Sequence, residues 1–98
     1  METKDHTLRE QEISRSQQAN QILQNNLFQE SIKTLKKLYS EALLDKTGAK
    51  ESDTREKLWI AYNVVGKVEQ HLKSILETGK LAEKQLEDFR KTESEKKF

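Results

Sequence analysis

The chain has 98 residues, of which 33% are apolar and 36% are charged, and its 18 basic and 17 acidic residues leave a formal net charge of +1. A chain this small and polar can build only a thin core, which association with another chain often supplements. Its near-zero charge gives no general reason to expect nucleic acid or an anionic membrane as a partner, and the absence of cysteine excludes disulfides and thiolate metal sites.

The N-terminal stretch METKDHTLREQE lacks the apolar run of a signal peptide, so we do not expect secretion. No apolar run approaches the length that spans a bilayer, and no membrane partner is predicted. The chain has no proline and only three glycines, whereas the helix formers Leu, Lys, Glu and Gln are frequent. Because no segment alternates polar and apolar residues with a period of two, we predict an all-α fold.

In chain order, residues 1–12 show no apolar pattern and are predicted to be a flexible N-terminal arm. Residues 13–89 are predicted to form a single helical-hairpin domain, and the charged residues 90–98 a C-terminal tail. Residues 13–25 could be helical but offer few apolar side chains. The first firm helix is predicted at about 26–44, because apolar residues recur there at intervals of four and three, as on one face of a helix: Phe28, Ile32, Leu35, Tyr39 and Ala42.

Each predicted helix begins with a capping signal. Asn25 or Asn26 can accept a hydrogen bond from a first turn, and Gln29, three residues after Asn26, would complete a capping box. The polar loop DKTGAKES follows, and Asp53 with Glu56 then repeats the same spacing. Two helix starts, near residues 26 and 54, are therefore predicted.

The second helix is predicted at about 54–77 from a second series of apolar residues at helical spacing: Leu58, Ala61, Val65, Val68, Leu72 and Ile75. The same register continues to Phe89, so this helix either runs to about residue 89 or breaks at Thr78–Gly79, since glycine favours a helix end. A loop of about eight residues makes the two helices antiparallel neighbours. The predicted architecture is an antiparallel helical hairpin.

Both predicted helices carry more apolar surface than one partner helix covers, and exposed apolar patches usually mark contact sites. The covering helix could come from residues 13–25 or 81–89, from a second copy or from a different protein. A helical bundle formed by a homo-oligomer, a dimer by default, is the expected geometry. The side chains expected to carry this association are Trp59, Tyr62, Leu38 and Leu76.

No residue pattern predicts catalysis. His71 is accompanied by no second histidine, cysteine or cluster of acids, and His6 lies in the predicted arm. A di-metal site on helices would need Glu-x-x-His pairs, and a phosphate site would need a glycine-rich loop; neither pattern occurs. We predict no catalytic residue, no cofactor site and no metal site, and hence a protein that is not an enzyme.

A second candidate site is basic and lies around the predicted loop. Lysines flank most soluble helices, and the near-zero net charge weakens the case for phosphate binding, so nucleic acid is a less favoured partner than protein. The side chains that could contact phosphates are Lys46, Lys50, Arg55 and Lys57.

Residues 25–89 resemble a family of short, uncharacterised helical proteins encoded in tailed-bacteriophage and prophage genomes. The residues that carry the resemblance are Asn25, Leu27, Phe28, Tyr39, the segment REKLW at 55–59, Val68, His71, Leu72 and the segment GKLA at 79–82. Members of the family often have proline after the first asparagine, where this chain has Asn26. The resemblance implies a place among virion and packaging genes, in the host cytoplasm or the virion, with no assigned catalytic residue.

These observations lead to one hypothesis and two alternatives. The leading hypothesis is a non-enzymatic helical interaction or structural protein of phage type, which self-associates or docks on a larger phage virion or assembly protein. The first alternative is a nucleic-acid-binding accessory protein, for packaging or regulation, that uses the basic loop. The second is a small inhibitor of a host protein.

Overall fold

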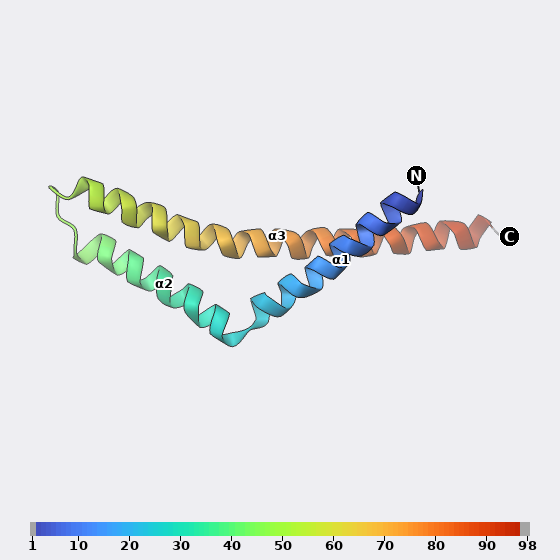
Figure 1. The fold of residues 1–98 in the computed structure, drawn as a ribbon, viewed down its shortest axis with the longest axis horizontal. Coiled ribbons are helices and arrows are strands. Elements are labelled where there is room, and N and C mark those ends of the chain that lie inside the picture. The colour runs from blue at the N-terminus through green and yellow to red at the C-terminus, as the bar shows by residue number, and fades with distance from the viewer. Residues whose placement is uncertain (1, 97–98) are drawn as a thin grey trace. The chain divides into compact units, whose positions relative to one another are not determined.

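The computed structural model describes residues 2–96, and its side chains are described over 6–93. This part of the chain contains three α-helices and no strand (Figure 1). The helices are α1 (Glu2–Gln24), α2 (Asn26–Asp45) and α3 (Ser52–Lys96). They form two compact units: unit 1 joins α1, up to Ile22, with α3 from Leu72 onward, and unit 2 takes Leu23–His71. The all-α prediction is confirmed.

Asn25 separates α1 from α2 and caps the second of these helices. It has an extended backbone, with φ −68° and ψ 124°, and its side-chain oxygen accepts a hydrogen bond from the Phe28 amide at 2.9 Å. The expected capping box is wrong, because the Gln29 side chain donates instead to the Leu23 carbonyl at 2.7 Å. That carbonyl lies in the last turn of α1, where backbone oxygens lack helical partners, and this is the reason it attracts the amide.

The start of α3 differs from the expected one by two residues. The helix begins at Ser52, and the Arg55 amide donates to the Glu51 carbonyl at 3.0 Å, so Glu51 holds the cap position. Asp53 lies in the first helical turn, where its carboxylate is stabilised by the positive end of the helix dipole. The expected capping box of Asp53 and Glu56 is therefore wrong, although both residues are where a helix start favours acids.

The second predicted helix is continuous. α3 passes through Gly66 and Gly79 and ends at Lys96, so the break considered at Thr78–Gly79 does not occur. Neither glycine has the positive φ of a helix C-terminal residue; none of the residues from 2 to 96 has one. The helix also includes residues 90–96 of the predicted charged tail. In the same way α1 includes residues 2–12, which were expected to form an arm.

Unit 1 is an antiparallel pair formed by α1 and the C-terminal half of α3. The His6 ring meets the Phe89 ring edge-on, with centroids 6.4 Å apart, and Arg9 Nε donates to Gln85 Oε1 at 2.8 Å. Further along, Ser16 lies against Gly79. These contacts pair rising residue numbers on α1 with falling numbers on α3, which fixes the antiparallel direction.

Small side chains let the two helices of unit 1 approach closely. Ser16 and Ala19 on α1 are each 3% exposed, and Ala82 on α3 is 0% exposed. A methyl group placed on Gly79 would overlap the Ser16 side chain and come within 2.9 Å of the Glu12 carbonyl oxygen. The contact therefore requires glycine at this position of α3. It also orders α1, whose apolar residues alone would bury too little.

Unit 2 is the predicted antiparallel hairpin of α2 and residues 52–71 of α3. Ile32 is its one buried apolar side chain, at 8% exposed, and Lys36 Nζ lies 3.2 Å from Glu69 Oε1 across the pair. Leu35 and Val68, which were expected to face the partner helix, remain 38% and 47% exposed. The contact line of the hairpin is therefore rotated away from these two residues.

Two glycines of the same helix give opposite predictions. Gly66→Ala should stabilise α3 by about 1 kcal/mol, because alanine favours a helix and a methyl group there has no neighbour within 4 Å. Gly79→Ala should destabilise unit 1 by about 1–3 kcal/mol in spite of the same gain, because α1 must move away. Amide hydrogen exchange, which reports each unit separately, should show faster exchange of the α1 amides only in the second variant.

Ser16→Gly provides the control for steric overlap. Added to Gly79→Ala, it removes the side chain that the new methyl group meets first and should restore part of the α1 protection. If α1 exchanges at the wild-type rate in Gly79→Ala alone, the close approach described above is wrong.

Candidate interaction surface

Unit 2 exposes six large apolar side chains, three from each helix. On α2 the exposed fractions are 71% for Leu27, 38% for Leu35 and 55% for Leu38. On α3 they are 52% for Ile60, 52% for Val64 and 47% for Val68. We call these six residues the apolar face.

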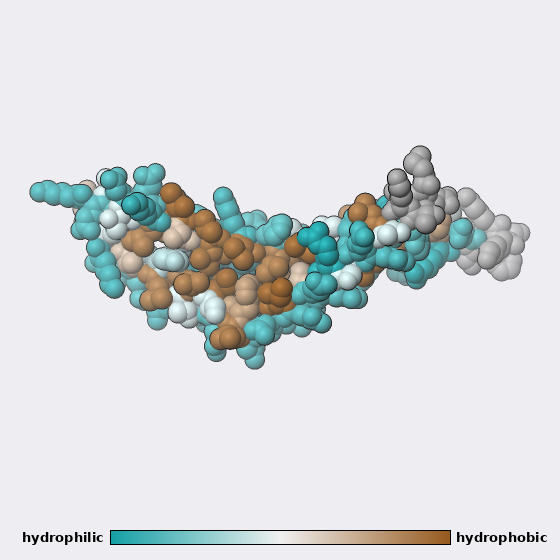
Figure 2. Space-filling view, viewed as in Figure 1, coloured by the Kyte–Doolittle hydropathy of each residue, from teal (hydrophilic) through white to brown (hydrophobic). Residues whose placement is uncertain are grey.

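Helical geometry places all six on the same side of the hairpin. Each residue advances about 100° around its helix, so the three leucines are rotated in one sense from the line of Phe28, Ile32 and Tyr39 that meets α3. Ile60, Val64 and Val68 are rotated in the same sense from the line of Leu58, Val65 and Leu72. In antiparallel helices, equal senses of rotation point to the same side, and Figure 2 shows apolar residues gathered over α2 and the first half of α3.

The apolar face is costly to leave in water. Apolar surface gains about 25 cal/mol per Å² when it is removed from solvent, and contiguous exposed patches on a folded chain usually mark a contact site. The six side chains come from consecutive turns of two neighbouring helices, so they form a patch and are not scattered single residues. The chemistry that this surface offers is burial against another apolar surface.

The four residues predicted to carry association divide between different places. Leu38 belongs to the apolar face. Trp59, which is 56% exposed, stacks on the half-buried Tyr62 with ring centroids 6.5 Å apart, and helical rotation places this pair on the opposite side of the hairpin. Leu76 is half-buried and belongs to unit 1. Sequence reasoning missed Ile60, Val64 and Val68 as a second stripe, although their spacing of four residues was visible.

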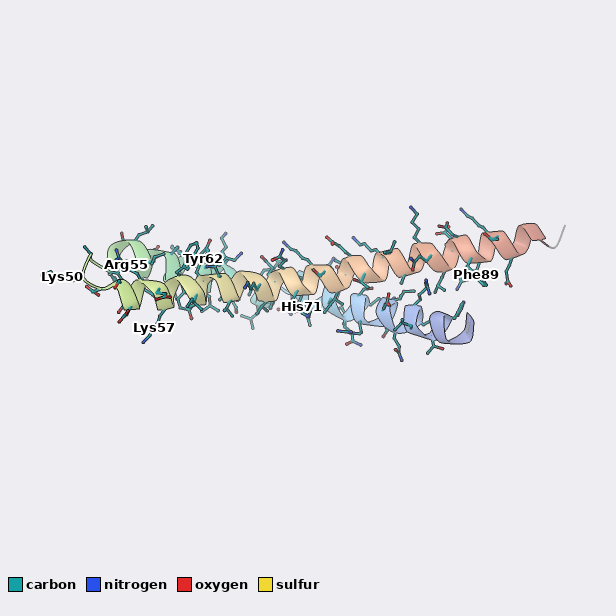
Figure 3. The ribbon with its side chains drawn as sticks, turned by 90° about the horizontal axis from the view of Figure 1, so that it is seen from above. Lys50, Arg55, Lys57, Tyr62, His71 and Phe89 are labelled. Atoms are coloured by element: carbon teal, nitrogen blue, oxygen red, sulfur yellow. The ribbon has the colours of Figure 1, made fainter. Side chains whose placement is uncertain are left out.

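The basic residues around the loop do not form one surface. Figure 3 shows Arg55 and Lys57 on opposite sides of α3, with Lys50 at the loop. Four acidic residues alternate with the four basic ones between 45 and 57, which makes this end electrically balanced. A groove that tracks a phosphate backbone needs an excess of positive charge. The acids that balance the predicted site are Asp45, Glu51, Asp53 and Glu56.

This charge balance predicts weak binding to DNA. We expect the chain to pass through a DNA column at about 0.15 M salt, where unbalanced exposed charges are already screened beyond about 8 Å. The variant Lys46→Gln, Lys50→Gln, Arg55→Gln should elute at the same salt concentration as the wild type. Retention that is abolished in the triple variant would contradict this expectation and favour the nucleic-acid alternative.

The two histidines have ordinary surroundings. His71 is exposed on α3 (Figure 3). His6 Nδ1 lies 3.4 Å from the Glu10 carboxylate one turn along α1, an interaction that carries charge on the histidine only when the ring is protonated. Among the side chains that the structure describes, no three histidine, cysteine or acidic groups gather as metal ligands would. Within residues 2–96, no helix is both long and apolar enough to cross a membrane.

Neighbouring residues on α3 separate packing from chemistry. Leu72 is half-buried, so Leu72→Asp should lower the free energy of unfolding by about 2–3 kcal/mol, through lost burial and the desolvation of a charge. His71→Ala should change it by less than about 0.5 kcal/mol, as is usual for exposed positions. Circular dichroism during urea unfolding measures both. A large loss of helix in His71→Ala would show that the histidine has a structural role.

Comparison with known proteins adds no relative. No protein family, no curated protein and no solved structure matches this chain.

Proposed function

We propose that this chain is a non-enzymatic interaction protein of phage type, which works by burying the apolar face of unit 2 against another protein surface. The exposure of six large apolar side chains on one side of a two-helix unit supports this proposal. A second copy of the chain or a larger virion or assembly protein would supply the covering surface. The site of action is the host cytoplasm or the virion.

The arrangement of the unit supports a docking role. α2 and α3 leave each other's flanks open, because each helix presents a stripe wider than the contact between them. A third and a fourth helix placed on the apolar face would complete a bundle of ordinary thickness. Docking of this kind needs no catalytic group, and its strength depends on buried apolar area and on the fit of the charged rim.

The phage context rests on the sequence resemblance of residues 25–89. A small helical protein that lies among virion and packaging genes has capsid, portal and tail proteins as its neighbours. The apolar face gives such a protein a means of attachment to one of them. The nucleic-acid alternative receives no support from the balanced charges at the loop.

Co-sedimentation with phage particles or assembly intermediates tests the proposal. Val64→Glu places a charge in the centre of the apolar face and should reduce the bound fraction at least about tenfold, because an unpaired buried charge exceeds the 1.4 kcal/mol that a tenfold change requires. The matched control is Leu44→Glu, since Leu44 is 78% exposed but lies outside this face. It should sediment like the wild type.

Two results would contradict the proposed function. One is a wild-type chain that never sediments with particles or their assembly intermediates. The other is equal binding of the wild type and Val64→Glu, which would place any contact elsewhere on the chain. Circular dichroism of both variants shows whether the helices are intact.

A further inference from the structure

We infer that a second copy of this chain covers the apolar face, in a dimer whose two-fold axis runs parallel to α2 and to the first half of α3. This inference rests on the proposed function, because it takes the apolar face to be a docking surface. It adds the partner and the geometry. The argument comes from the charges that border the face.

A two-fold dimer requires a surface that is complementary to itself. Two copies of a helical hairpin can meet face to face in two ways. With the axis parallel to the helices, α2 of one copy lies over α3 of the other. With the axis perpendicular to them, α2 lies over α2 and α3 over α3.

The charged rim of the apolar face favours the first arrangement. Helical rotation places Glu30 and Glu41 along the outer edge of α2, while Lys57 and Lys67 follow α3 on the side of the apolar face. All four side chains are exposed. With α2 placed over the partner's α3, acidic residues face basic ones; the perpendicular axis places like charges together, which is unfavourable.

The charges next to this rim do not reverse the preference. Lys37 Nζ lies 3.9 Å from Glu41 Oε1, but both side chains are more than half exposed, and such a surface pair contributes only about 0.2–1 kcal/mol. Asp53 and Glu56 also lie on α3, nearer to the loop than Ile60, where the apolar face begins. Along the apolar face itself, the α2 edge is mainly acidic and the α3 edge mainly basic.

Other parts of the chain are occupied elsewhere. The buried side of α1, formed by Ser16 and Ala19, packs on α3 near Gly79 and Ala82 in unit 1. Apart from that side, α1 has no continuous apolar stripe to offer to unit 2. A second copy brings a matching apolar face of equal size.

The contact between Lys36 and Glu69 sets the register. Leu38 lies about 3 Å nearer to the loop than Lys36, and Val64 about 8 Å nearer than Glu69, at the helical rise of about 1.5 Å per residue. The two residues therefore lie at similar heights on neighbouring helices. With an axis parallel to the helices, Leu38 of one copy faces Val64 of the other.

Light scattering of the purified full chain gives the first test. We expect a dimer of about 23 kDa, twice the chain mass of 11.5 kDa, at a concentration of about 100 µM, which populates any dimer with a tighter dissociation constant. Val64→Glu should be a monomer, and Leu44→Glu should remain a dimer. A monomeric wild type overturns the inference. If that monomer still sediments with phage particles through the apolar face, the proposed function survives without it.

Disulfide cross-linking tests the axis, and the chain has no cysteine of its own. Leu38→Cys and Val64→Cys replace exposed side chains, so both variants should fold. When the two are mixed and oxidised, the mixed disulfide should form faster than either symmetric one, as measured by mass spectrometry. Faster formation of the Leu38–Leu38 disulfide overturns the parallel axis.

Charge reversal provides an independent test. Glu41→Lys and Lys57→Glu each turn an attraction into a repulsion at two symmetric places and should weaken the dimer about tenfold. The double variant exchanges the charges and should recover the wild-type dissociation constant. Additive weakening in the double variant overturns the facing of α2 on the partner's α3.

Discussion

The close approach of α1 and α3 at Gly79 is the contact on which the described fold depends. Glycine in a helix interior is unfavourable by about 1 kcal/mol relative to alanine, so its presence in the middle of α3 needs a compensating interaction. Ser16 supplies it, because the two backbones come close enough to bury Ser16, Ala19 and Ala82 almost completely. That contact turns a polar N-terminal sequence into a packed helix.

The two units use different kinds of packing. Unit 1 brings backbones together over small residues, and its largest buried apolar side chain is Leu86, at 6% exposed. Unit 2 brings together larger side chains, among which only Ile32 is buried. Bulky residues hold two helices further apart and leave their flanks in water. The same polar composition therefore yields a close contact at one end of α3 and an exposed apolar face at the other.

Much of this fold was predictable because it depends on local patterns. The absence of proline and the spacing of three and four residues predicted α2 to within one residue at its end, and predicted a second long helix through Gly79. The helix at 2–12 was not predicted, since its order comes from packing on residues more than sixty positions away. The capping residues were also missed, because the Leu23 carbonyl competes for the Gln29 amide.

The candidate surface was only partly predictable for a related reason. A sequence shows which residues share a helical stripe but leaves open which edge of that stripe meets the partner helix. A rotation of the contact line by a fraction of a turn buries Tyr62 more than Val68, although both fit the same pattern. Leu38 was identified correctly as exposed, whereas the stripe of Ile60, Val64 and Val68 became visible only when α2 was in place.

The sparse burial in unit 1 has a thermodynamic consequence. Few apolar groups stabilise α1 against α3, whereas the backbone hydrogen bonds of α3 continue unbroken from one unit into the other. Cooperative all-or-none melting requires that every part of a chain lose its structure together. Here α1 can detach while α3 stays helical, so heating should release the chain in stages, and no single melting temperature describes it.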